Sequence, residues 1–132
     1  MIHRFEVRAN DPSSDPTARR TLRQARALGI APETVHTARV FLLEAKLSES
    51  QIDTLRSSLF ADPVLESCSL GASAAPAGMQ SIEVHPLPGV MDPAAMTVRC
   101  AVAELTGIDQ IRVSTGWRYD FAKLFAIARK PT

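Results

Sequence analysis

The side chains best suited to chemistry in this chain, its histidines and cysteines, are few and widely spaced. A metal site or an activated nucleophile needs several such groups held close together. The spacing offers no such pattern, and the cysteines form no CxxC pair. We expect solvent-facing strand histidines and two buried or half-buried thiols, with no catalytic, cofactor-binding or metal-ligating residue. These residues are His3, His36, His85, Cys68 and Cys100.

The densest charge is a run of four arginines, which could contact phosphate or an acidic partner. Aromatic residues are few and not interleaved with the run, which argues against single-stranded nucleic-acid binding. We interpret the run as the solvated face of a helix. The aspartates that precede prolines are typical of helix caps and turns rather than of acid–base catalysis. The arginines are Arg19, Arg20, Arg23 and Arg26, and the Asp-Pro pairs begin at Asp11, Asp15, Asp62 and Asp92.

Motifs that cradle phosphates or activate a serine are absent from the sequence. The run Pro86–Val90 is interpreted as a turn between a strand and a helix, and Trp117 as a core residue. Both assignments have a binding alternative, because such a turn can approach a small ligand and tryptophan is favoured at protein interfaces.

Length and composition indicate one compact domain or two very small ones. The chain has 132 residues, of which 45% are hydrophobic and 22% charged, and its formal net charge is +1. These values are ordinary for a globular protein and give no global field that would attract nucleic acid or an anionic membrane. No apolar run approaches the roughly 18 residues of a membrane span, and the start lacks a signal-peptide pattern. We therefore predict a cytoplasmic protein.

The elements that would position these side chains follow from hydrophobic spacing and from caps. Residues 4–8 alternate between polar and apolar, which predicts a half-buried strand. Asp15 followed by proline predicts a helix start, and that helix should stop near Gly29. Residues 35–45 are predicted to be extended.

A second helix and a strand should complete this first unit. Ser48 and Gln51 have the spacing of a capping box, and Asp62 with the following proline should end the helix. Residues 64–70 then predict a short strand, and the small, uncharged segment 71–78 a linker.

The pattern recurs after the linker. Residues 81–85 alternate like the first strand, Asp92 followed by proline repeats the cap, and residues 117–121 can supply a second strand. The number of residues between the two strands equals the number between the two caps. Arg39 corresponds to Arg112 with a small deletion. We interpret the recurrence as a duplication.

The second unit is shorter than the first. Residues 122–132 contain no match to the second helix and last strand, although Leu124, Phe125 and Ile127 could begin a short helix. A missing strand would leave a sheet edge unpaired, and such an edge favours a partner or a second copy.

The predicted fold is therefore α+β, a two-layer sandwich of tandem repeats with an antiparallel sheet and helices on one face. The expected boundaries are residues 1–70 for the first repeat, 71–78 for the linker and 79–132 for the second, shortened repeat.

The chain resembles the small PurS-type subunit of phosphoribosylformylglycinamidine synthase. In its duplicated form it is similar to the N-terminal region of the single-chain versions of that enzyme. The resemblance covers about residues 2–121 and depends on the order of short motifs. These are Phe5-Glu6-Val7, Asp15-Pro16, Ala38-Arg39-Val40 and Ala61-Asp62-Pro63-Val64.

The resemblance implies a non-catalytic scaffold for de novo purine biosynthesis. Such a part joins the glutaminase to the ATP-dependent synthetase and helps ammonia pass between them. It implies no catalytic activity for this chain alone, no site residue and no cofactor.

A tandem regulatory domain that binds an amino acid or another small ligand is the alternative. The strand, the turn at Pro88-Gly89 and the helix of the second unit resemble the ACT family. The first unit has Pro12-Ser13-Ser14 at that place instead. A thermal shift with a small ligand would favour this alternative.

Overall fold

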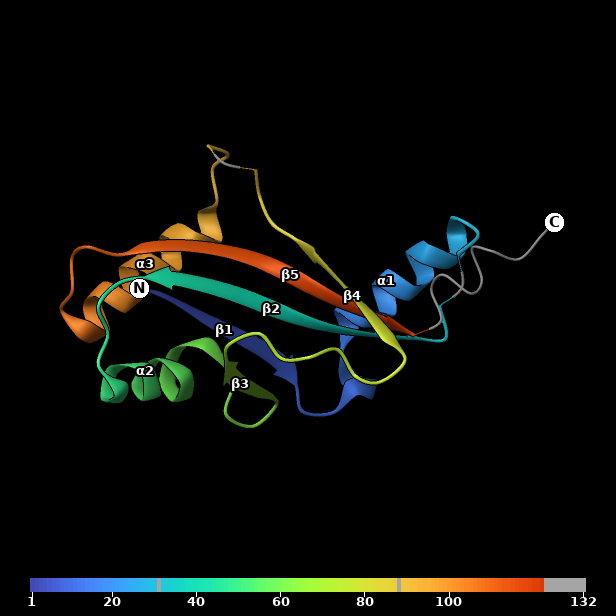
Figure 1. Ribbon diagram of the computed structural model, residues 1–132, viewed down its shortest axis with the longest axis horizontal. Coiled ribbons are helices and arrows are strands. Elements are labelled where there is room, and N and C mark those ends of the chain that lie inside the picture. Colours follow the sequence, from blue (N-terminus) through green and yellow to red (C-terminus); the bar gives the residue numbers. More distant parts are fainter. Residues whose placement is uncertain (31, 88, 123–132) are drawn as a thin grey trace.

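One five-stranded antiparallel sheet contains strands from both halves of the chain (Figure 1). The computed structural model describes residues 1–30, 32–87 and 89–122. The strand order is β3-β1-β2-β5-β4. The strands are β1 (Ile2–Ala9), β2 (Thr34–Glu44), β3 (Glu66–Leu70), β4 (Met79–Val84) and β5 (Arg112–Ala122).

The centre of the sheet is the pair formed by β2 and β5, which run antiparallel over their whole lengths. Arg39 lies opposite Trp117 in the middle of this pair. Successive residues of a strand point to opposite faces, so Val35, Phe41 and Leu43 share one face of β2. These three side chains belong to cores that contain helical residues, which places the helices on that face.

Two helices begin with the same arrangement of hydrogen bonds. In α1 (Pro16–Ala27) and α3 (Pro93–Thr106), one oxygen of the N-cap aspartate accepts a bond from the first turn. The second oxygen accepts bonds from the backbone N–H and the hydroxyl of a threonine in the following strand. The hydroxyl distances are 2.6 Å from Thr37 to Asp15 and 2.9 Å from Thr115 to Asp92. Each aspartate therefore caps its helix, as predicted, and in addition links that helix to the sheet.

The main core lies between the sheet and the second predicted helix. The ring of Phe60 packs 4.6 Å from that of Phe5 and 4.7 Å from that of Phe41, measured between centroids. Leu55 and Val102, fully buried, complete it from α2 and α3. Each such side chain contributes roughly 1.5–3 kcal/mol when removed from water. A smaller core of Ala18, Val35 and Phe121 lies under α1.

The second helix begins at the predicted capping box and ends slightly earlier than predicted. α2 (Glu49–Leu55) has reciprocal bonds between Ser48 and Gln51, and a π-helical turn, η2 (Arg56–Phe60), follows it. The carboxylate of Asp62 then accepts the N–H groups of Val64 and Leu65. This local turn delays the start of β3 to Glu66.

The last strand is longer than the sequence indicated. β5 begins at Arg112 rather than at Trp117, because it pairs with β2 along eleven positions. The predicted correspondence of Arg39 in the first unit with Arg112 in the second is wrong. Arg39 lies in the middle of β2, whereas Arg112 is the first residue of β5 and lies opposite Glu44. The short helix expected around Leu124 lies outside the described residues.

Candidate functional site

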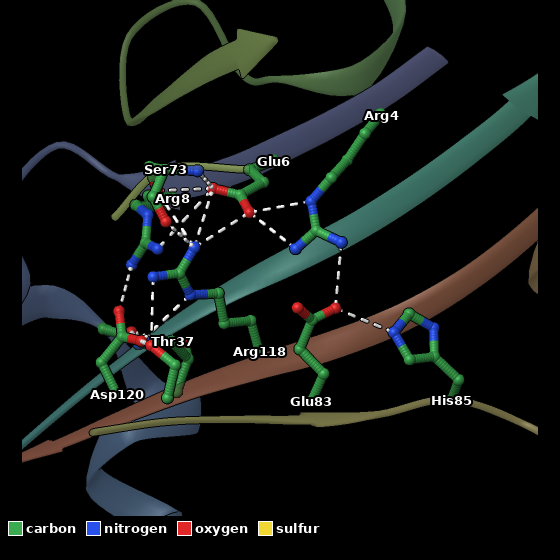
Figure 2. Close-up of polar contacts among 11 residues, drawn as sticks. Arg4, Glu6, Arg8, Thr37, Ser73, Glu83, His85, Arg118 and Asp120 are labelled. Carbon is green, nitrogen blue, oxygen red and sulfur yellow. Dashed lines mark hydrogen bonds and ion pairs between the residues drawn. The ribbon is translucent and has the colours of Figure 1, made fainter. Parts of the chain in front are cut away.

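A cluster of charged side chains lies on the face of the sheet opposite the helices (Figure 2). This ionic cluster consists of Arg4, Glu6 and Arg8 on β1 and Arg118 and Asp120 on β5. At its centre Arg118 is 3% exposed and donates from Nε to Asp120 at 3.0 Å and from Nη1 to Glu6 at 3.1 Å. Both carboxylates are completely buried. The cluster therefore connects β1 to β5 across the strand between them.

The small side chain of Ala38 makes this connection possible. Ala38 lies on β2 directly opposite Arg118, and it is 1% exposed. A larger residue there would occupy the path that the Arg118 side chain follows to Glu6. Alternation along the strands carries a sequence signal for the cluster, because Arg4, Glu6 and Arg8 share one face of β1. The cluster was nevertheless not predicted, since the pairing of charges on β1 with charges on β5 depends on the strand order.

The segment predicted to be a linker crosses this face as a strap, residues 71–78. The carbonyl oxygen of Ser73 accepts a bond from Nη1 of Arg118 at 2.6 Å. The Ser73 hydroxyl donates to Glu6 at 2.7 Å. Figure 1 shows the strap running from β3 to β4, the two edges of the sheet. It therefore helps to shield the ionic cluster from water as well as linking the two halves.

Hydrogen bonding keeps the two buried carboxylates ionised. Burial alone would raise the pKa of Glu6, but bonds from Ser73 and Arg4 outweigh it and the net shift is downward. Burial likewise opposes the lowering of the pKa of Asp120, which bonds from Ser81 and Arg118 produce. Both groups are thus charged at neutral pH and engaged with cations, an arrangement that suits structure better than proton transfer.

The cluster extends to the edge of the sheet through Glu83 and His85. Arg4 donates to Glu83 at 3.0 Å, and Nε2 of His85 lies 2.9 Å from the same carboxylate oxygen. The bond from Arg4 is the main reason that the pKa of Glu83 is lowered. The imidazole of His85 lies against Gly116 on β5, where a Cβ would clash with it.

The other histidines do not join this site. His3 is paired with Leu43 on the helix-bearing face of the sheet, and its Nε2 is buried without a hydrogen-bond partner in the described chain. The expectation that His3 faces solvent is therefore wrong, because it shares the phase of Phe5 on β1. His85 is exposed as expected, and His36 is half-buried on β2.

Neither cysteine belongs to a group of metal-binding side chains in the described part of the chain. Cys68 is half-buried on β3, and burial raises the pKa of its thiol to about 11. Cys100 is exposed, contrary to expectation, because the buried positions of α3 are Ala95 and Val102. Within the described residues no three His, Cys, Asp or Glu side chains are grouped closely enough to hold a metal ion.

The predicted basic run lies on the outer side of α1. All four arginines, Arg19, Arg20, Arg23 and Arg26, are exposed, as expected for a solvated helix face. Trp117, predicted to be a core residue, is only half-buried and stacks on Tyr119 with ring centroids 6.5 Å apart.

Of the two edge strands of the sheet, β4 is the more exposed, and it carries an apolar surface. Ile82 and Val84 are 43% and 55% exposed, whereas Phe5 and Val7 on β1 are 0% and 2% exposed. The helix-bearing face of β1 is covered by α2 and η2, and its outer edge is paired with β3. In the described part of the chain β4 pairs only with β5, so its outer edge is also open. We call Ile82, Val84 and this edge the β4 surface.

Comparisons of the chain with family models, with curated proteins and with solved structures find no match. Among the residues that the structure describes, no helix combines the length and the apolar character needed to span a bilayer.

Proposed function

We propose that the chain is a non-catalytic scaffold made of two related units. β1, α1 and β2 follow one another in the same order as β4, α3 and β5. The two caps and their threonine anchors, Asp15 with Thr37 and Asp92 with Thr115, support this relation. Without a common origin, each unit would have had to acquire separately an aspartate that both caps a helix and accepts a bond from a strand threonine.

The register of the central strands also supports two related units. Thr37 pairs with Tyr119, and Phe41 pairs with Thr115. A two-fold rotation about the Arg39–Trp117 pair exchanges these two pairs, so each threonine takes the place of the other. A duplicated unit that packs against its own copy has this symmetry.

The single observation that carries the scaffold role is the difference between β1 and β4. The rotation relates Phe5 and Val7 of β1 to Ile82 and Val84 of β4. The two β1 side chains are buried beneath α2 and η2 and beside β3, whereas the two β4 side chains are exposed. Exposed apolar side chains beside an unpaired strand edge favour protein binding. The second unit thus exposes a surface whose counterpart in the first unit is covered by α2 and η2.

The resemblance to the PurS-type subunit suggests the partners. We propose that the β4 surface binds the synthetase or the glutaminase of phosphoribosylformylglycinamidine synthase. The chain would then contribute to purine synthesis by holding these two enzymes together for ammonia transfer. Its contribution would be positional, without a reacting group of its own.

The test is binding to purified glutaminase and synthetase subunits, with Val84→Lys on the β4 surface and Val64→Lys as matched control. Val64 is 79% exposed in the turn before β3, away from β4. A lysine at position 84 should weaken binding by about tenfold or more, because it places a charge in an apolar contact. Val64→Lys should bind like the wild type.

Co-elution in gel filtration and glutamine-dependent synthetase activity are the readouts. The proposal is abandoned if the wild-type chain binds neither subunit, or if both lysine variants bind equally well.

A further inference from the structure

The helix-bearing face is hollowed at its centre, next to the Arg39–Trp117 pair. A cavity of about 400 Å³ lies there between η2 and α3. Phe41 and Trp117 contribute aromatic surface, and Leu59 and Val98 contribute aliphatic surface. Its size and mostly apolar lining match those of small-molecule sites. We call it the central cavity.

Arg39 is the one ionisable residue among the described residues that line the central cavity. Its Nη2 donates to Glu66 at 3.0 Å and to the carbonyl of Phe60 at 3.4 Å. Its Nε and Nη1 have no hydrogen-bond partner in the described chain. The guanidinium carbon lies 5.7 Å from the centroid of the Phe41 ring, which holds the positive charge beside an apolar surface.

The remaining polar groups favour one orientation of a ligand. Thr97 and Thr115 also line the cavity, but their hydroxyls donate to the Pro93 carbonyl and to Asp92, so they have no proton left to offer a ligand. A neighbouring cavity of about 470 Å³ shares Arg39 but includes the carboxylates of Asp62 and Glu66. Negative charge is therefore disfavoured there and favoured at the free donors of Arg39.

We propose that the central cavity binds a small carboxylate with an aromatic or aliphatic body. The carboxylate accepts hydrogen bonds from Arg39, and the apolar body packs between Phe41, Trp117 and α3. The site is independent of the scaffold role, because its lining includes neither Ile82 nor Val84.

The experiment titrates the whole chain with 3-phenylpropionate and with its uncharged analogue 3-phenylpropanamide. Calorimetry gives the affinities, and the fluorescence of Trp117, the only tryptophan in the chain, reports on the cavity. The carboxylate should bind about tenfold or more tightly than the amide, because hydrogen bonds between ionised partners are the stronger ones. Equal affinities in the wild type would overturn the proposal.

Three variants locate the site. Ala94→Leu fills the cavity from an exposed position of α3 and should abolish binding of both compounds. Arg39→Gln should remove the preference for the carboxylate. Glu66→Gln removes the competing carboxylate and should tighten binding of 3-phenylpropionate, which keeps the test decisive if Arg39→Gln does not fold. Undiminished binding by Ala94→Leu, or weaker binding by Glu66→Gln, would contradict the assignment.

Discussion

At the scale of single residues, Arg118 is the buried cation at the centre of the ionic cluster. Its guanidinium donates to both buried carboxylates, to Ser73 and to Ser81. A buried ion pair adds little net stability over an apolar alternative, but a buried charge left without its partner is costly. Arg118 is therefore important mainly because it bonds both buried carboxylates, whereas of these two Arg4 bonds only Glu6, at 2.7 Å, and Arg8 bonds Asp120 at 3.1 Å.

Arg118→Met should lower the free energy of unfolding at pH 7 by about 3 kcal/mol, the low end for a broken buried ion pair, since Glu6 keeps Arg4 and Asp120 keeps Arg8. The folded-state pKa values of Glu6 and Asp120 are lowered, so in the wild type their stabilisation is present above the unfolded pKa and lost as pH falls. In the variant, protonation relieves the uncompensated charge. The difference between the two proteins should therefore shrink towards about pH 4.

Urea denaturation of both proteins at the two pH values measures this difference. Arg23→Met, at an exposed position of α1, is the control and should change stability by less than about 0.5 kcal/mol. A deficit for Arg118→Met that equals the control, or one that grows in acid, would show that the ionic cluster is not what stabilises this face.

At the scale of elements, locally encoded features were predictable and long-range ones were not. The caps at Asp15 and Asp92 and the box at Ser48 depend on residues within one turn, and all three are confirmed. The length of β5 depends on pairing with β2, and the course of the strap depends on Ser73 meeting Arg118. Neither partner is near in sequence, so the composition of these segments could not reveal their roles.

Gly116 illustrates such a long-range constraint. Its missing side chain leaves room on β5 for the imidazole of His85, which follows β4. Gly116→Ala should destabilise the fold by about 1–3 kcal/mol, because the methyl group would lie too close to the His85 ring and to the backbone carbonyl of Val84, which cannot turn away as the ring can. Ser114→Ala, an exposed position on the same face of β5, should be nearly neutral.

A double-mutant cycle with His85→Ala isolates this contact. The combined variant His85→Ala/Gly116→Ala should recover part of the stability lost in Gly116→Ala, with the carbonyl of Val84 as the remaining close neighbour. Strictly additive losses in urea denaturation would show that the ring and the glycine are not coupled.

At the scale of the whole molecule, the two halves share one sheet. β2 and β5 pair along eleven residues, and the ionic cluster adds a second connection between β1 and β5. Separate domains joined by a linker would bury their own cores and could unfold independently. Here the core side chains of α2 and α3 belong to one cluster, so neither half retains its packing when the other opens.

One cooperative unfolding transition is therefore expected, and removal of either cap should shift it. Asp15→Ala and Asp92→Ala each remove a helix cap and leave a strand threonine without its acceptor, at a cost of about 1–2 kcal/mol. Circular dichroism of the helices and fluorescence of Trp117 should give the same midpoint in each variant. Two transitions, with each variant moving only one of them, would mean that the halves fold as independent domains. Glu104→Ala, at an exposed position of the same helix as the Asp92 cap but away from it, serves as the control.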